Sequence, residues 1–467
     1  MPLHRAAPAP PDDDAGVEIR PQFAQAGETG IVPKLRLPDG ELAAETAYQV
    51  VHDELLLDGH ARLNLATFVT TWMEPQARVL IDECLDKNMI DKDEYPQTAE
   101  LERRCVNMLA ALWGSESTGG DATGCSTTGS SEACMLGGLA LKWRWRERRR
   151  AAGKATDRPN LVMGANVQVC WEKFCRYWDV DPRLVPVSPE ATHLTAEGAA
   201  SHCDENTIGV VAILGSTFDG SYEPVAEIAA ALDALQARSG LDVPLHVDAA
   251  SGGFVAPFLD PDLAWDFRLA RVQSINASGH KYGLVYPGVG WAVWRDKEAL
   301  PADLIFDVDY LGGQMPTFAL NFSRGGAQVV AQYYNLIRLG REGYRRVQQA
   351  SRETAMWLAG EIGKLGEYRL LSDGGELPVF AFAVADEACG FSVYDVSEKL
   401  RIRGWIVPAY PMPTGMEDVS VLRVCVRNGF SRDLASIFLE DLKLATERLR
   451  HRAEGPPPDA VRASFHH

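Results

Sequence analysis

The chain has 467 residues, of which 46% are hydrophobic, so it can bury a large core, and its length predicts two or more structural lobes. Its 46 basic and 64 acidic residues give a formal net charge of −18, which argues against nucleic acid or an anionic membrane surface as a partner. An acidic substrate would need local positive charge in its binding site.

The nine cysteines show no paired metal-binding spacing, and their odd number argues against a complete disulfide framework. The start of the chain lacks the apolar stretch of a signal peptide, and no apolar run is long enough to span a bilayer. We therefore expect a soluble, cytoplasmic protein with no bound metal and no membrane segment.

Residues 1 to about 40 are rich in proline and aspartate and lack apolar periodicity, which predicts a mobile tail. Apolar side chains at a helical period then predict an amphipathic helix over 99–113. A Gly/Ser/Thr loop over 124–133 follows and leads into a helical pattern that continues through Trp145.

Short apolar runs next alternate with helical patterns, which predicts an α/β fold with a mainly parallel sheet whose strands end at one edge. The runs are 160–164, 207–215 and 243–248, and the helical patterns are 167–178 and 223–237. A further strand over 288–295 and a long helix from 321 to about 352 lead to a smaller C-terminal lobe. The predicted divisions are 1–60 (tail and segment), 61–345 (large domain), 346–455 (small domain) and 456–467 (tail).

Three motifs in these elements carry candidate chemistry. The first is the Gly/Ser/Thr loop, which can offer hydroxyls and free backbone N–H groups to a phosphate at a helix N-terminus. It has neither the Walker spacing nor the dinucleotide-binding spacing. Helix capping by Ser130 is an equally good explanation.

The second motif is the apolar run 243–248, which ends in Asp248 and small residues and is typical of a buried parallel strand that opens into a site. A carboxylate there can keep a pyridine nitrogen protonated. An aspartate that caps the next turn is the simpler alternative.

The third motif places Lys281 directly behind His280 and among small residues. A lysine becomes nucleophilic toward an aldehyde when burial or a neighbouring cation lowers its pKa from about 10.4. Alone, the string also fits a surface lysine. Together, the phosphate loop, the aspartate and the lysine match the needs of pyridoxal 5′-phosphate.

These strings resemble the bacterial glutamate decarboxylases, which are pyridoxal-phosphate enzymes of fold type I. The resemblance extends over roughly residues 45–450 and returns at the last few residues. It implies a large domain with a mainly parallel seven-stranded sheet flanked by helices, and a smaller α+β C-terminal domain. The strings that carry it are 129–133, 246–250 and 278–283, with 55–59, 63–68, 88–96, 142–146 and 309–313.

The resemblance implies that Lys281 carries the cofactor covalently, that Asp248 pairs with its ring nitrogen, and that His280 assists. Ala250 and Gln168 would cover the two ring faces, and Thr217 would make a polar contact to the ring. Phosphate contacts would come from Ser130, Ser131, Ser278 and His280, and from Ser323 of a partner subunit.

For the substrate, the resemblance implies that Thr67 and Phe68 receive the side-chain carboxylate, with Asp91 from the neighbouring subunit. Asp91 and the side-chain carboxylate of the substrate carry like charges, and each raises the pKa of the other. One of the two would then be protonated, so this pocket would favour acidic conditions. Arg423 fits the arginine that binds the α-carboxylate, although it also fits a structural ion pair.

The chain ends in Ser464-Phe465-His466-His467, which is similar to the C-terminal plug of the same family, with His467 at the plug position. Histidine changes its charge near neutrality. We expect the neutral tail to block the site and protonation to expel it. A frayed tail or a tag remnant is the alternative.

The implied activity is decarboxylation of L-glutamate to 4-aminobutanoate, by a homodimer or homohexamer, in 4-aminobutanoate metabolism or acid resistance. Related decarboxylases that act on aspartate, cysteine sulfinate or an aromatic amino acid are the main alternative. An aminotransferase or an inactive scaffold is less compatible with the motifs.

Overall fold

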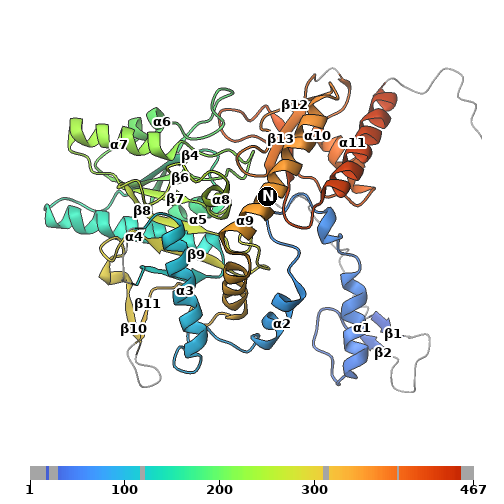
Figure 1. Cartoon of the computed structure of the whole chain (residues 1–467), viewed down its shortest axis with the longest axis horizontal. Coiled ribbons are helices and arrows are strands. Elements are labelled where there is room, and N and C mark those ends of the chain that lie inside the picture. Colours follow the sequence, from blue (N-terminus) through green and yellow to red (C-terminus); the bar gives the residue numbers. More distant parts are fainter. Residues whose placement is uncertain (1–16, 20–29, 116–120, 309–314, 387–388, 454–467) are drawn as a thin grey trace, which may run out of the picture. The chain divides into compact units, whose positions relative to one another are not determined.

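Figure 1 shows the computed structural model, which describes residues 17–19, 30–115, 121–308, 315–386 and 389–453. The chain divides into two compact units, residues 1–64 and 65–467, and each is described by itself. The boundaries predicted at 345 and 455 stay predictions. No helix in the described ranges is both long enough and apolar enough to cross a bilayer.

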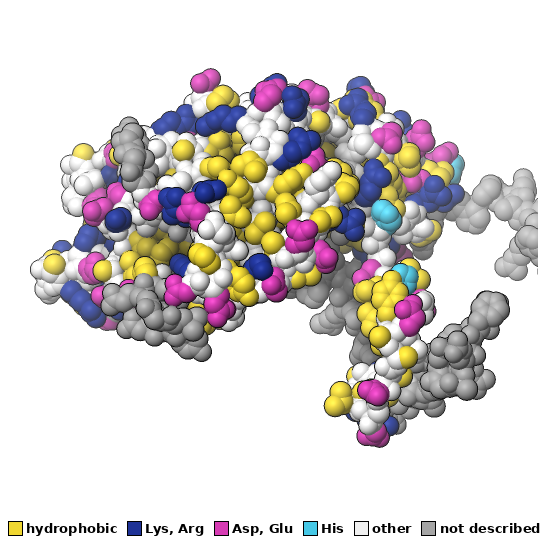
Figure 2. Space-filling model, turned by 60° about the horizontal axis from the view of Figure 1, so that its bottom comes forward, with side chains coloured by type: hydrophobic (Ala, Val, Ile, Leu, Met, Phe, Trp, Pro, Cys, Tyr) yellow, Lys and Arg dark blue, Asp and Glu magenta, His cyan; other side chains and the backbone are white. Residues whose placement is uncertain are grey.

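In the first unit, β1 (Val17–Ile19) pairs antiparallel with β2 (Gly30–Val32), followed by α1 (Ala44–Leu55) and the short helix η1 (Ala61–Leu63). The prediction of a mobile tail over residues 1 to about 40 did not include these two strands, which form a short antiparallel ladder. Helix α1 exposes Tyr48, Val51 and Leu55, and apolar side chains are visible on this part of the chain in Figure 2.

The second unit is built on a seven-stranded sheet, and the predicted mainly parallel fold is confirmed. All neighbouring strands run parallel except β9, which is antiparallel to both of its neighbours. The strands in spatial order are β3 (Gly124–Thr127), β9 (Gly290–Trp294), β8 (Val272–Ala277), β7 (Leu245–Asp248), β6 (Thr207–Ile213), β4 (Asn160–Gly164) and β5 (Asp181–Val185).

The sheet lies between two layers of helices, because successive residues of a strand face opposite sides. In β6, Val211 and Ile213 pack with α4 (Ser130–Ala151) and α5 (Val169–Tyr177). Val210 and Ala212 belong to the larger core on the other face. That core also contains residues of α3 (Pro96–Leu112), α7 (Val225–Ser239), α8 (Ala256–Leu259) and α9 (Ala327–Gly363).

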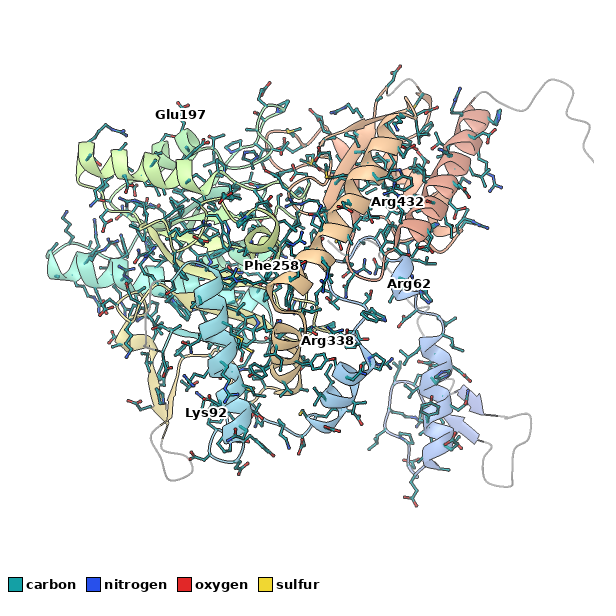
Figure 3. All side chains as sticks on the ribbon, viewed as in Figure 1. Arg62, Lys92, Glu197, Phe258, Arg338 and Arg432 are labelled. Carbon is teal, nitrogen blue, oxygen red and sulfur yellow. The ribbon has the colours of Figure 1, made fainter. Side chains whose placement is uncertain are left out.

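Helix α9 leads from the large sheet to the C-terminal lobe and is kinked at Gly340, whose φ of 56° glycine adopts at little cost. The helix packs against the larger core through stacked rings. Phe258 of α8 and Tyr344 have centroids 5.0 Å apart, and Figure 3 labels Phe258 beside α9.

The C-terminal lobe has a four-stranded antiparallel sheet covered by helices, which confirms the predicted smaller α+β part. Strand β15, which carries Arg423, lies between β13 and the edge strand β14. The elements are β12 (Tyr368–Leu370), β13 (Val379–Val384), α10 (Val393–Arg401), β14 (Ala409–Pro411), β15 (Ser420–Cys425) and α11 (Arg432–Ala453).

The remaining elements are short connections around the sheet. They are α2 (Pro75–Glu83), α6 (Ala196–Ser201), the helices η2 (Gly252–Phe254) and η3 (Ala302–Leu304), and the hairpin of β10 (Phe306–Val308) and β11 (Met315–Thr317).

Candidate active site

A cavity of about 290 Å³ lies at the carboxyl ends of β6 and β7, beside the start of α4. It brings together residues from distant parts of the chain, as expected where parallel strands end at one edge. The predicted site residues that line it are Ser130, Ser131, Gln168, Thr217, Asp248, Ala250, Ser278, His280 and Lys281.

One end of the cavity is formed by the first turn of α4. Ser130 and Ser131 open this helix, so their backbone N–H groups have no partner within it. The Ser278 hydroxyl donates to the Ser130 hydroxyl at 2.7 Å. A Cβ on Gly129 would lie 2.9 Å from the His280 ring, so this close approach requires glycine. The result is a group of hydroxyl and N–H donors whose chemistry suits a phosphate.

Four donors hold the Asp248 carboxylate. Trp171 Nε1 lies 2.8 Å and Cys134 Sγ 3.6 Å from Oδ2, while Asn276 Nδ2 lies 2.9 Å and the Ala250 N–H 3.1 Å from Oδ1. Hydrogen bonds to a carboxylate favour its charged form. Asp248 is only 4% exposed, so it is a buried anion held by donors at one side of the cavity.

This network continues away from the cavity through His246. Its Nε2 lies 2.8 Å from Asn276 Oδ1, and its Nδ1 lies 2.7 Å from Ser274 Oγ. Burial lowers the pKa of His246, so the ring is neutral. The sequence did not single out Asn276 or Trp171. The signal available for Asn276 was its position at the end of the strand preceding Lys281.

Lys281 also lines the cavity. Burial lowers the pKa of its amine, and Nζ donates to Ser251 Oγ at 3.3 Å. The amine lies 5.2 Å from the centre of the Phe68 ring. The backbone is held by Thr70, whose hydroxyl donates to the Lys281 carbonyl at 2.7 Å and whose N–H donates to the His280 carbonyl at 2.8 Å.

Gln168 both caps a helix and lines the cavity. Its Oε1 accepts from the N–H of Cys170 at 2.6 Å, which satisfies a free donor at the start of α5. Its side chain is exposed, as a residue at a helix start normally is, and the cavity is what it faces. The capping and cofactor explanations of this residue are therefore compatible.

Arg423 and Phe68 lie next to the cavity without being part of its lining. The Arg423 guanidinium carbon is 4.6 Å from the centre of the Phe68 ring. Its Nη1 donates to the Thr217 carbonyl at 2.6 Å, and Nη2 donates to the Ala66 carbonyl. Thr67 is adjacent in the chain and its hydroxyl accepts from the Val69 N–H at 3.0 Å. The Phe68 ring thus lies close to both the amine of Lys281 and the guanidinium of Arg423.

Asp91 and Ser323 lie away from the cavity lining, on two segments that pair with each other. Asn88 Nδ2 donates to the Ser323 hydroxyl at 3.3 Å, and the Met89 N–H donates to the Arg324 carbonyl at 2.9 Å. The two residues predicted to serve a partner subunit therefore belong to one local surface. His466 and His467 lie outside the described residues.

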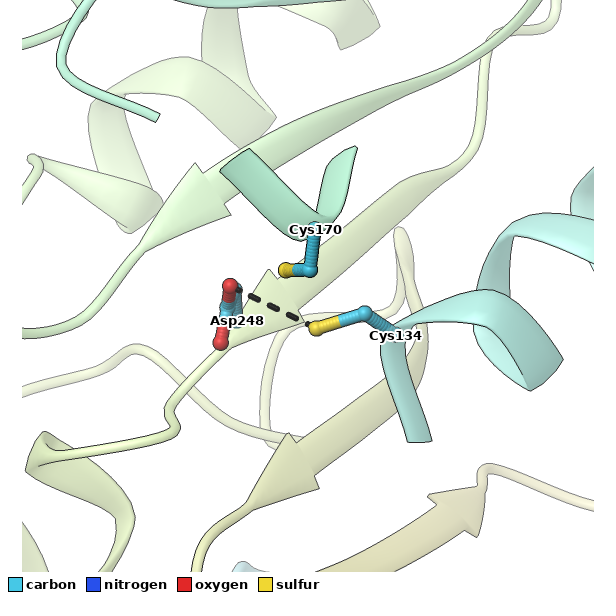
Figure 4. Close-up of side chains that lie close together, drawn as sticks. All are labelled: Cys134, Cys170 and Asp248. Carbon is cyan, nitrogen blue, oxygen red and sulfur yellow. Dashed lines mark hydrogen bonds between the residues drawn. The ribbon is translucent and has the colours of Figure 1, made fainter. Parts of the chain in front are cut away.

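Cys134, Cys170 and Asp248 lie together in the cavity wall, with one possible ligand atom from each within 4.8 Å of the others (Figure 4). Burial raises the pKa of the Cys134 thiol, which disfavours the thiolate that a metal requires. Three ligands also fall short of the four of a closed zinc site. The absence of a metal stays a prediction.

Residues 38–385 match the family model described as the pyridoxal-dependent decarboxylase conserved domain. The chain belongs to this family of pyridoxal-phosphate-dependent carboxy-lyases. Within the family, it is 57% identical to the glutamate decarboxylase of Aliivibrio fischeri, over 89% of this chain and 90% of that one. It is 48% identical to glutamate decarboxylase 1 of Arabidopsis thaliana, over 93% of this chain and 87% of that one.

A solved structure, glutamate decarboxylase of Lactobacillus brevis, superimposes with a TM-score of 0.88 at 46% identity, covering 91% of this chain and 97% of that chain. The cavity described above fits the cofactor of the family. It offers phosphate donors at one end, an anionic partner for a ring nitrogen at one side, and a buried amine.

Proposed function

We propose that the chain decarboxylates L-glutamate to 4-aminobutanoate and carbon dioxide, consuming one proton per turnover. The observation that carries this proposal is that the buried Lys281 amine shares one cavity with Asp248 and lies close to Phe68, which in turn lies close to Arg423. The amine that would attach the cofactor and a cationic anchor for an amino acid therefore lie against the same aromatic ring.

On the cofactor side, Lys281 is the amine that attaches pyridoxal 5′-phosphate. Ser130, Ser131, Ser278 and His280 bind the phosphate group. Asp248 holds a proton at the ring nitrogen, supported by its four donors. When bound, the cofactor supplies a ring that accepts the electrons left on Cα as carbon dioxide departs.

The same side needs residues that confine the ring. Gln168 and Ala250 cover its two faces, and Thr217 makes a polar contact at its edge. All three line the cavity, which supports these assignments.

On the substrate side, Arg423 binds the α-carboxylate and orients the bond that breaks. Arg423 is 6% exposed, so a carboxylate paired with its guanidinium would be largely shielded from water. Thr67 and Phe68 bind the far end of the substrate with Asp91 of a second subunit. The segments that carry Asp91 and Ser323 contact each other outside the cavity lining. This supports a homodimer, or a hexamer built from dimers, in which each subunit completes its partner's site.

Because each turnover takes up a proton, activity in a cytoplasmic setting would raise the internal pH. This supports a role in acid resistance or in 4-aminobutanoate metabolism. The pH-dependent tail plug of His466 and His467 would belong to the same response.

The test is carbon dioxide release from L-glutamate across pH, for the wild type and for Lys281→Ala. We expect release by the wild type and a loss of at least about 10³-fold in the variant, because the covalent step needs this amine. Hydride trapping followed by mass spectrometry should locate the cofactor on Lys281. An adduct on another residue would contradict the assignment. A panel with aspartate, cysteine sulfinate and aromatic amino acids separates the alternative substrates.

A further inference from the structure

Arg423 is held between two aromatic rings that come from different parts of the chain. The guanidinium carbon lies 4.6 Å from the centre of the Phe68 ring and 5.7 Å from the centre of the Tyr410 ring. Phe68 is already assigned to the substrate pocket. Tyr410 has no assigned role, and the sequence did not single it out.

The strand register explains why Tyr410 reaches Arg423. Tyr410 of β14 is directly opposite Val421 of β15, and residues 421 and 423 share one face of that strand. Tyr410 and Arg423 are therefore diagonal neighbours, within reach of each other for long or aromatic side chains. The Arg423 N–H also donates to the Pro408 carbonyl at 3.2 Å, which fixes the spacing of the two strands.

The Tyr410 ring is itself fixed. Its hydroxyl donates to the Phe218 carbonyl at 2.6 Å, and its ring meets the Phe218 ring edge to face, with centroids 5.8 Å apart. Burial raises the pKa of Tyr410 to about 12, so the phenol keeps its proton and remains a donor. The ring is thus anchored to the loop that follows β6, the loop that also provides Thr217.

The contacts of Arg423 show why a ring is needed there. Nη1 and Nη2 donate to the carbonyls of Thr217 and Ala66, which are neutral acceptors. The salt bridges found among the described residues do not include Arg423, and its Nε has no hydrogen-bond partner in this structure. A buried cation without an anionic partner gains most from the faces of aromatic rings.

We propose that Tyr410 is a positioning residue that holds Arg423 ready for the substrate α-carboxylate. This inference rests on the proposed function, in which Arg423 binds that carboxylate. An aromatic ring stabilises the cation without neutralising it, whereas an aspartate or glutamate in the same place would compete with the substrate. Tyr410 acts through Arg423 and need not contact the substrate.

The test compares Tyr410→Phe, which keeps the ring, with Tyr410→Leu and Tyr410→Met, which remove it. Loss of the ring should raise KM for glutamate by about 5- to 30-fold, the size of a desolvated cation–π contact, with kcat changed less than about threefold. Tyr410→Phe keeps the ring and should stay within about twofold of the wild type. Tyr394→Leu, at a half-exposed tyrosine of the same lobe, is the matched control and should leave KM unchanged.

Product inhibition separates positioning from general damage, because 4-aminobutanoate lacks the α-carboxylate. Its inhibition constant should stay within about twofold in Tyr410→Leu and Tyr410→Met. In an Arg423→Ala background, the additional effect of Tyr410→Leu should fall below about twofold. Equal shifts in KM and in the inhibition constant, or the same effect of Tyr410→Leu in both backgrounds, would overturn the proposal.

The failure of the proposed function would look different. In that case, the wild type would release no carbon dioxide from glutamate. A wild type that is active while Arg423→Ala leaves KM unchanged would overturn both the arginine assignment and the role of Tyr410.

Discussion

His280 and Lys281 are adjacent titratable residues, and burial makes both less basic than they are in water. The pKa of His280 is lowered to about 4, by burial first and then by the neighbouring Lys281 charge. The pKa of Lys281 is lowered mainly by burial. Near neutral pH, the imidazole is therefore uncharged, and more of the amine is in its nucleophilic form than in an exposed lysine.

The lowered pKa of His280 predicts how the cofactor-free protein responds to acid. The unfolded chain binds this proton near pH 6.5 and the folded chain only near 4, so stability falls as the pH drops through that window. In His280→Gln, we expect this acid-side loss to be smaller by up to about 3 kcal/mol. Urea unfolding of the cofactor-free protein at several pH values measures it. His52→Gln, at an exposed histidine, is the control. If the free energy of unfolding fell equally with decreasing pH in the wild type, His280→Gln and His52→Gln, the prediction would be contradicted.

At this scale, the sequence identified the groups that carry chemistry but missed the groups that hold them. Asp248 and Lys281 stand in short local motifs at predicted strand ends. Trp171 and Asn276, which donate to Asp248, are 77 and 28 residues away from it. Tyr410 is likewise connected to Arg423 only by the pairing of two strands. Such contacts depend on strand order, which residue types alone do not specify.

At the scale of elements, Glu132 in the first turn of α4 connects two segments around the site. Its Oε2 accepts from the Thr128 N–H, the Thr128 hydroxyl and Asn321 Nδ2. Its Oε1 accepts from the N–H groups of Leu320 and Asn321. One carboxylate, well placed at a helix N-terminus, therefore orders both the turn before the phosphate end of the cavity and the segment that leads to Ser323.

We predict that Glu132→Gln weakens both segments, because an amide cannot accept at both of its ends. The free energy of unfolding should fall by about 1–3 kcal/mol, and the affinity for pyridoxal 5′-phosphate should fall as well. Denaturant unfolding and cofactor titration measure these effects. Glu147→Gln, an exposed position on the same helix, should change neither. An unaltered cofactor affinity in Glu132→Gln would refute the connection.

The predicted helices and strands were correct where the hydrophobic pattern was periodic. They were less accurate where contacts between distant segments determine the local structure. The strand 160–164 and the helices at 99–113 and 167–178 were predicted within a few residues. The segment 124–127 was predicted as loop and is instead β3, because all four residues pair with β9 although the segment begins with glycine, which is unfavourable in strands. The helix predicted from Asn321 begins at Ala327. Backbone N–H groups in the preceding segment donate instead to the side chains of Glu132 and Asn88.

At the scale of the whole molecule, the proposed exchange of Asp91 and Ser323 between subunits makes a distinct prediction. Lys281→Ala and the double variant Asp91→Ala/Ser323→Ala should each be inactive or strongly impaired. Mixing them with reassortment of subunits should restore about a quarter of the wild-type activity, because half of the random dimers carry one intact site. Carbon dioxide release before and after mixing measures it. No recovery, with mixed dimers demonstrated by mass, would show that each subunit uses its own residues.

The two hydrogen bonds from Thr70 to the backbone of His280 and Lys281 limit how this scaffold can acquire new substrates. Replacing the whole segment that carries Thr67 and Phe68 would also shift the backbone of His280 and Lys281, to which Thr70 is hydrogen-bonded. Swapping this stretch with that of a paralogue would therefore disturb the chemistry before it altered selectivity. Evolution and protein engineering alike should find it easier to change individual side chains here than to transplant the loop.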